Sequence, residues 1–127
     1  MVLDLNCMTN RIIGAAIKVH KALGPGLLES AYETCLNHEL KKAGFKLERQ
    51  KPQPVIYEGI TIDCGYRMDL VVENSIVLEL KAVEKVLPIH KAQLLSYLRL
   101  SGCKVGLLIN FNTKYLKEGI SRIVNQF

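Results

Sequence analysis

The stretch "RMDLVVENSIVLELKAV", residues 67–83, decides the fold because it contains two apolar runs of strand length separated by a short polar segment. Glu73-Asn74-Ser75 suits a tight turn between two strands. Residues 66–73 and 76–83 are therefore predicted to pair as an antiparallel hairpin. The apolar content of both runs indicates that this hairpin lies in the core.

Charged side chains interrupt both predicted strands. Asp69 lies in the first strand, and Glu79 and Lys81 lie in the second. Alternate residues of a strand share a face, so Glu79 and Lys81 point the same way, and Asp69 joins them if the two faces coincide. Burying such charges is costly unless they are paired or hold a metal. Spacing alone leaves two explanations open: ion pairs on a solvent-facing sheet surface, which could also join Asp69 to Arg67, or a cation site.

The rest of the chain predicts helices on both sides of a sheet. Thr9 or Asn10 is available as the N-cap of a first helix, and Gly44 is suited to end the second. The tail, 115–127, fits either a short helix or a final strand. In chain order we predict helices at 9–23 and 27–43, strands at 45–50, 53–62, 66–73 and 76–83, a helix at 88–100 and a strand at 104–111. The order αα-ββββ-α-β indicates an α/β protein, a mixed sandwich around one sheet.

Length and cysteine usage limit the classes of protein. The 127 residues fit a single domain over 1–127, with 1–8 as an N-terminal extension. No apolar run reaches the roughly 20 residues that cross a bilayer. "MVLDLNCMTN" lacks the layout of a secretory signal, so a cytoplasmic protein without a membrane partner is expected. The four cysteines include no CxxC pair, which favours buried reduced thiols over an iron–sulfur or zinc site.

Two of the predicted helices carry polar side chains beside their apolar stripes. Glu29 falls on the stripe of the second helix that should face the core. The helix dipole alone also favours an acid in a first turn, so this residue has two explanations. In the third helix His90, Gln93 and Tyr97 share one side. A helix-start histidine is by itself more often a partly exposed structural residue.

Together these segments resemble a known family. "HKALGPGLLESAYE" (20–33), "YRMDLVV" (66–72), "LELKAV" (78–83), "HKAQLLSYL" (90–98) and "VGLLINF" (105–111) are similar, in this order, to stretches of the GxxExxY proteins. These are small bacterial members of the PD-(D/E)XK nuclease superfamily, and "GLLESAY" (26–32) carries the motif that names them. The resemblance covers roughly residues 10–125 and implies a restriction-endonuclease-like α/β/α sandwich. One departure is that Met68, rather than proline, precedes Asp69.

The resemblance also implies roles for individual residues. It assigns Asp69 and Glu79 as ligands of a divalent cation, Mg²⁺ or Mn²⁺, and Lys81 as the lysine of the motif. Glu29 would be the acid of the helix and a further candidate ligand, and Gln93 would belong to a Gln-xxx-Tyr element. The backbone carbonyl of Leu80 is a candidate third oxygen for a hard cation. Secondary candidates are His20, Tyr32, His90 and Tyr97.

The expected activity is metal-dependent hydrolysis of phosphodiester bonds, with DNA as the expected substrate and Lys81 assisting the attacking water. The net charge of +5 is compatible with a phosphate backbone. Because no base-reading module appears, specificity is expected to follow the shape of the nucleic acid or a protein partner. Small size favours a homodimer that cuts two strands. The alternatives are a module that binds nucleic acid or protein without catalysis, and chemistry on a small phosphate ester.

Overall fold

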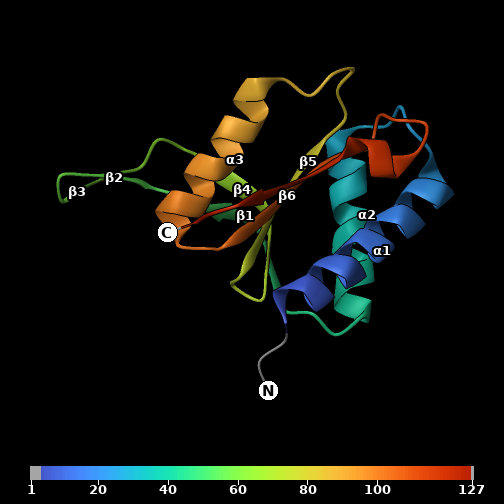
Figure 1. Ribbon diagram of the computed structural model, residues 1–127, viewed down its shortest axis with the longest axis horizontal. Coiled ribbons are helices and arrows are strands. Elements are labelled where there is room, and N and C mark those ends of the chain that lie inside the picture. The colour runs from blue at the N-terminus through green and yellow to red at the C-terminus, as the bar shows by residue number, and fades with distance from the viewer. Residues whose placement is uncertain (1–3, 127) are drawn as a thin grey trace.

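A computed structural model describes residues 4–126 as three layers, with a central five-stranded sheet between helices (Figure 1). Helices α1 and α2 cover one face and α3 covers the other, which confirms the expected mixed α/β/α sandwich. The strand order in the main sheet is β1-β4-β5-β6-β7. The elements are α1 (Leu5–Leu23), α2 (Glu29–Lys42), β1 (Leu47–Pro52), β2 (Val55–Tyr57), β3 (Ile60–Ile62), β4 (Arg67–Val72), β5 (Ile76–Lys81), α3 (Pro88–Ser101), β6 (Val105–Asn110), η1 (Leu116–Gly119) and β7 (Ile120–Val124).

The central hairpin forms as predicted. Strands β4 and β5 pair antiparallel, with Leu70 opposite Leu78 and Val72 opposite Ile76. The turn between them contains Glu73 and Asn74, whose left-handed φ angle of 52° is typical of tight hairpin connections. After the α3 crossover, β6 lies parallel to β5 and is buried along its whole length. A strand covered on both faces accounts for the continuous apolar run in this part of the sequence.

Two apolar clusters hold the layers together. The cluster between the sheet and α1–α2 includes Tyr32, Leu36, Leu70, Leu78, Leu80, Leu107 and Phe111. The smaller cluster under α3 includes Met68, Val71, Val77, Leu94, Tyr97, Leu98 and Leu108. Met68 and Leu70 therefore pack on opposite sides, although alternation would place them on the same face. The regular pleat of β4 is interrupted at Asp69.

The segment 53–62 departs from the prediction of one strand. It folds back on itself as the hairpin β2–β3, a separate two-stranded sheet. The reversal occurs at Glu58 and Gly59, whose φ angles of 47° and 78° suit a two-residue hairpin turn. Five strands rather than four therefore precede α3. In Figure 1 this hairpin projects away from the layered body.

The ends of several elements also differ from the prediction. Helix α1 begins at Leu5, and the carboxylate of Asp4 caps it by accepting the backbone N–H of Asn6 at 3.0 Å. Thr9 and Asn10 therefore lie inside the helix, and the hydroxyl of Thr9 donates to the carbonyl of Leu5. Of the expected extension, 5–8 are helical, and 1–3 lie outside the described residues.

Helix α2 begins at residue 29 rather than 27 and ends, as expected, just before Gly44. The ambiguous tail contains both alternatives, because η1 is followed directly by β7. β7 pairs antiparallel with β6 at the edge of the sheet. In the described part of the chain, no helix combines the length and apolar character needed to span a membrane.

Candidate functional site

The candidate site begins where the ladder between β4 and β5 stops. Paired residues run only from Leu70–Leu78 toward the turn. Beyond them, two carboxylates replace backbone partners: the N–H of Asp69 donates to Glu79 Oε1 at 3.4 Å, and the N–H of Leu80 donates to Asp69 Oδ2 at 2.8 Å. The opening between the strands therefore brings Asp69 and Glu79 side by side, as the sequence predicted.

Electrostatics make this pair unfavourable on its own. Glu79 is 5% exposed. Burial raises the pKa of its carboxyl group to about 9, and the negative charge of Asp69 adds to the effect. The positive charge of half-buried Lys81 lowers this pKa, but it does not offset the other two causes. Without a further cation, Glu79 therefore holds a proton at neutral pH.

The backbone of Leu80 points toward the same opening. The N–H of Phe111 donates to the carbonyl of Lys81 at 2.8 Å, so Lys81 directs its peptide groups toward β6. Successive residues of a strand direct these groups to opposite neighbours. Leu80 therefore directs both its N–H and its carbonyl toward β4, where Asp69 already accepts the N–H. This orientation is the one that the proposed third oxygen ligand requires.

Glu29 lies at the end of β5 next to this opening. Its Oε2 accepts the backbone N–H of Ala82 at 3.1 Å, directly after Lys81 in the chain. The stripe on which Glu29 was placed is buried further along α2, at Leu36 and Leu40, but Glu29 itself is exposed. The first turn of α2 extends past the end of the sheet. The structure thus brings Glu29 to the backbone beside the motif lysine.

The helix α3 borders a cavity of about 610 Å³ between itself and the segment that carries β2. Gln93, His90 and Tyr97 all line this cavity, together with Tyr66. Burial raises the pKa of the Tyr97 hydroxyl to about 12, with a further contribution from the charge of Glu79. Tyr97 therefore lines the cavity and lies within the electrostatic influence of Glu79. His90 also has a structural role, because its Nδ1 accepts the N–H of Leu87 at 3.0 Å at the start of the helix.

The remaining secondary candidates, His20 and Tyr32, lie in the layer of α1 and α2. His20 Nε2 is hydrogen-bonded to the carbonyl of Thr113 at 2.8 Å. Tyr32 is fully buried, and its hydroxyl donates to the carbonyl of Gly24 at 2.6 Å. It also accepts the N–H of Leu27 at 3.1 Å. These hydrogen bonds all go to backbone groups of loops, so both side chains brace loops at this end of the fold.

Sequence reasoning did not identify Gln50 as part of the site. Its Nε2 donates to Glu33 Oε1 at 2.6 Å and to Asp69 Oδ1 at 3.2 Å, so one amide bridges two carboxylates. Glu33 is buried and also pairs with Arg49 at 3.0 Å. Gln50 has a left-handed φ of 49°, a sparsely populated conformation for a residue of its type. No sequence pattern indicates such a conformation inside a strand.

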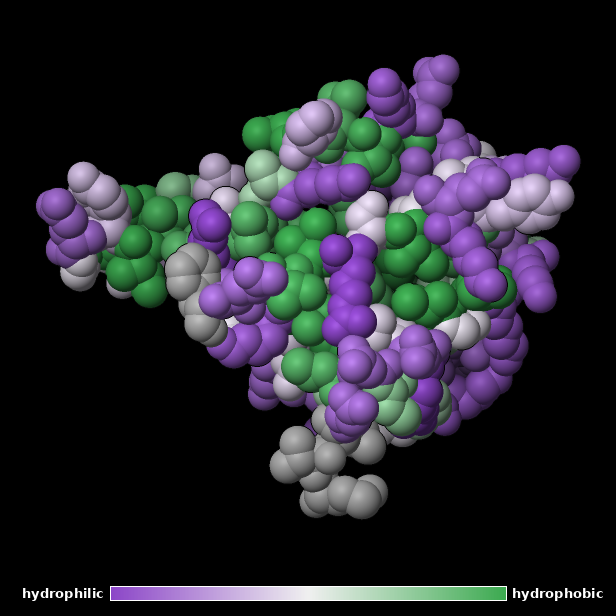
Figure 2. Space-filling view, viewed as in Figure 1, coloured by the Kyte–Doolittle hydropathy of each residue, from purple (hydrophilic) through white to green (hydrophobic). Residues whose placement is uncertain are grey.

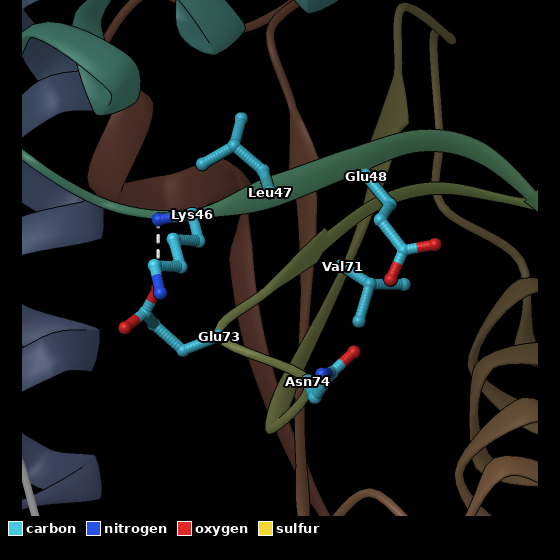
Figure 3. A pocket seen from close by; sticks show the side chains of 6 residues that line it. All are labelled: Lys46, Leu47, Glu48, Val71, Glu73 and Asn74. Atoms are coloured by element: carbon cyan, nitrogen blue, oxygen red, sulfur yellow. Dashed lines mark hydrogen bonds between the residues drawn. The ribbon is translucent and has the colours of Figure 1, made fainter.

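A separate hollow of about 330 Å³ lies at the other end of β4 (Figure 3). Leu47, Glu48 and Val71 form part of its lining, and the N–H of Lys46 donates to Glu73 Oε2 at 2.6 Å across it. The lining of this hollow includes both acidic and basic side chains, but none of the predicted site residues. The candidate catalytic residues therefore lie at the Asp69 end of β4 and not at this hollow.

The donor set at this end fits a hard divalent cation. Within residues 4–126, no group of three or more His, Cys, Asp or Glu side chains is arranged to hold a metal. A cation at this end would therefore have two protein carboxylates as ligands, those of Asp69 and Glu79. The Leu80 carbonyl faces the same opening. Mg²⁺ is commonly held by one or two carboxylates, with waters and substrate phosphate as its other ligands. The raised pKa of Glu79 is the physical sign that a positive charge suits this position.

Comparison with known proteins identifies the family. The model of the PD-(D/E)XK nuclease superfamily matches residues 6–123, which is nearly the whole chain and spans every residue of the site. The chain belongs to the PD-(D/E)XK nuclease superfamily. Neither a curated protein nor a solved structure matches it. Nucleases of this superfamily generally use divalent ions such as Mg²⁺ or Mn²⁺, and membership implies a nucleic-acid substrate. The three-layer architecture is the restriction-endonuclease-like fold expected for the superfamily.

Proposed function

We propose that this chain is a metal-dependent nuclease that hydrolyses phosphodiester bonds in DNA. The observation that carries the proposal is the contact of half-buried Asp69 with buried Glu79, because burial and the charge of Asp69 keep Glu79 protonated when no cation is bound. The two carboxylates would hold Mg²⁺ or Mn²⁺, with the Leu80 carbonyl as a third protein oxygen. A bound divalent ion would polarise the phosphoryl group and add positive charge where negative charge develops.

The chain's own groups would do the remaining work. Lys81 provides a proton donor and a positive charge beside Glu79, suited to orient the attacking water and to stabilise the developing anion. Glu29 fixes the backbone that follows Lys81 and thereby positions this lysine. Gln93 and Tyr97 line the adjacent cavity, where their polar groups can orient a phosphate or a water. Glu29 also stays the further candidate ligand that the resemblance implied.

Several finer assignments belong to the same proposal. Membership of the GxxExxY group is supported by "GLLESAY" at 26–32 and by the position of Glu29 beside the motif lysine. We also propose a cytoplasmic protein that acts as a homodimer, since one small domain offers limited surface to grip two strands. A protein partner would supply specificity that the chain lacks.

The test is cleavage of plasmid, linear, branched and single-stranded DNA with Mg²⁺, with Mn²⁺ and with EDTA. Asp69→Asn and Lys81→Ala should each lower the rate at least about 100-fold, because each removes a group that acts on the transition state. Lys85→Ala is the matched control, because Lys85 is exposed on the loop after β5. Binding of Mn²⁺ should be measured on the same proteins by electron paramagnetic resonance.

Cleavage that all variants share equally would identify a contaminating nuclease and refute the assignment. Mn²⁺ binding with no cleavage of any substrate would favour the module that binds without catalysis. Hydrolysis of small phosphate esters but not of polymers would place the same site in different chemistry.

A further inference from the structure

A hollow of about 720 Å³ lies where the end of α1 meets η1, and its charged lining is entirely cationic. Lys21 comes from α1, and Lys114 and Lys117 come from the segment after β6. No Asp or Glu lines the hollow. Tyr115 contributes a ring that is 61% exposed. We name this feature the basic hollow and define it by the three lysines. Figure 2 shows hydrophilic side chains gathered over this corner of the molecule, with apolar residues exposed between them.

The three lysines are exposed and take no part in the ion pairs found among the described residues. The Nζ of Lys114 lies 5.5 Å from the centre of the Tyr115 ring, a contact that leaves its charge unneutralised. The hollow between α1 and α2 differs in this respect, because Lys18 there binds Glu39 at 3.0 Å. The basic hollow therefore concentrates positive charge that the fold itself does not use.

The position of the basic hollow relates it to the candidate site. Asn110 lies opposite Lys81 in the register of β5 and β6, and the segment with Lys114 and Lys117 begins only a few residues later. On its other side the hollow includes Gly24 and Pro25, in the loop that leads into α2 and Glu29. Both borders thus belong to the end of the sheet where the motif lysine lies.

We propose that the basic hollow binds phosphates of the nucleic-acid strand that flanks the bond at the Asp69–Glu79 site. The ligand class is a polyanionic phosphodiester backbone, read as charge rather than as sequence. Lysine is suited to this role as a point charge for phosphate, and each neutralised phosphate releases counterions. The inference rests on the proposed function for the identity of the substrate, but its test is binding rather than cleavage.

The experiment measures fluorescence anisotropy of labelled single-stranded and duplex DNA over a salt series, in EDTA so that no cleavage occurs. The variant is Lys21→Gln/Lys114→Gln/Lys117→Gln. The slope of log affinity against log salt should become shallower by about 2–3, since each lost phosphate contact changes it by roughly 0.7–0.9. Affinity at low salt should fall at least about tenfold.

The matched control is Lys41→Gln/Lys42→Gln/Lys46→Gln. It removes the same three charges, so both variants reduce the net charge from +5 to +2. Its lysines lie at or beyond the far end of α2, about 20 Å along the helix from Glu29 at 1.5 Å per residue. The control should retain the wild-type slope within about half a unit, because its lysines contact no phosphate.

Equal losses in both variants would overturn the inference by showing that total charge governs binding. An unchanged slope in the first variant, or no DNA binding by the wild type, would also overturn it. The proposed function can fail separately. If the salt slope depends on the basic hollow but the protein cleaves no DNA with Mg²⁺ or Mn²⁺, the inference about phosphate binding stands and the proposed function is wrong. If the protein cleaves DNA in a metal-dependent way but its salt slope does not depend on these lysines, the proposed function stands and the inference is wrong.

Discussion

Replacing Glu79 with glutamine should make the metal-free protein more stable, increasingly so as the pH rises. The folded protein holds a proton on Glu79 up to a pKa of about 9, whereas the ordinary pKa is 4.5. Folding therefore takes up a proton between these values, and the stability of the wild type falls as pH rises through that window. At about 1.4 kcal/mol per pH unit, the loss reaches about 4 kcal/mol over three units.

The magnitude is large because a small domain is stable by only about 5–15 kcal/mol. The glutamine side chain imitates the protonated acid: its oxygen can accept the N–H of Asp69, as Glu79 Oε1 does, and its amide can donate to the Asp69 carboxylate. The variant should therefore keep the local geometry. It should not show the pH dependence that this group gives the wild type.

The assay is urea unfolding followed by circular dichroism in EDTA, for both proteins at several pH values between about 5.5 and 8.5, inside the window set by the two pKa values. The difference in unfolding free energy between them isolates Glu79, because all other titrating groups are shared. Saturating Mn²⁺ should then stabilise the wild type by about 3 kcal/mol at 100 times its dissociation constant, and the variant much less.

Parallel pH curves for wild type and variant would refute this reasoning, because they would show that Glu79 is ionised in the folded protein. The matched control is Glu84→Gln, which removes an exposed acid on the loop after β5. A pH trend common to both variants would belong to the loss of negative charge and not to burial.

Three further changes test the site and its frame. Gln50→Asn keeps a residue type that tolerates the left-handed backbone but shortens the amide bridge, so Mn²⁺ affinity should fall about tenfold while the melting temperature is maintained; equal affinity in titration calorimetry would contradict the bridging role. Gly119→Ala would place a Cβ against the backbone oxygen of Asn110, which cannot move aside, so it should destabilise by more than about 3 kcal/mol in urea unfolding. Gly106→Ala meets the side chain of Leu94 at 2.9 Å rather than backbone, so it should cost about 1–2 kcal/mol, and equal losses in the two glycine variants would refute the distinction.

The parts of the fold that the sequence predicted are those with strong local patterns. The hairpin of β4 and β5, the buried β6 and the helix α3, which begins at Pro88 and is capped by Gly102, each combine an apolar pattern with a turn or capping residue. The prediction was wrong for 53–62, where Glu58 and Gly59 separate two short apolar runs and reverse the chain between them. It also placed the start of α1 too late, because the helix is capped by Asp4 and the apolar period used for the prediction does not extend that far.

The candidate site was predictable where a charge stood inside an apolar strand. Asp69, Glu79 and Lys81 were conspicuous for that reason, and the structure brings Asp69 and Glu79 together, with Lys81 near enough for its charge to lower the pKa of Glu79. Gln50 was not predictable, because an amide is unremarkable in an exposed strand and its left-handed backbone follows from the site rather than from local propensity. The bond from Glu29 to the backbone after β5 likewise depends on how α2 docks against the sheet, which no local pattern encodes.

The β2–β3 hairpin has a consequence for how this protein can vary. Pro52 pairs with Arg67, and the N–H of Gln53 donates to the carbonyl of Tyr66 at 2.9 Å, so the chain leaves the main sheet and returns to it at neighbouring rungs. Everything between is a module attached at a single point, with Ile56, Tyr57 and Ile60 more than half exposed. We therefore expect insertions, deletions or grafts there to leave the strand order of the main sheet and the carboxylate pair intact. A new recognition element can therefore be exchanged at this arm beside the α3 cavity while the chemical centre stays constant.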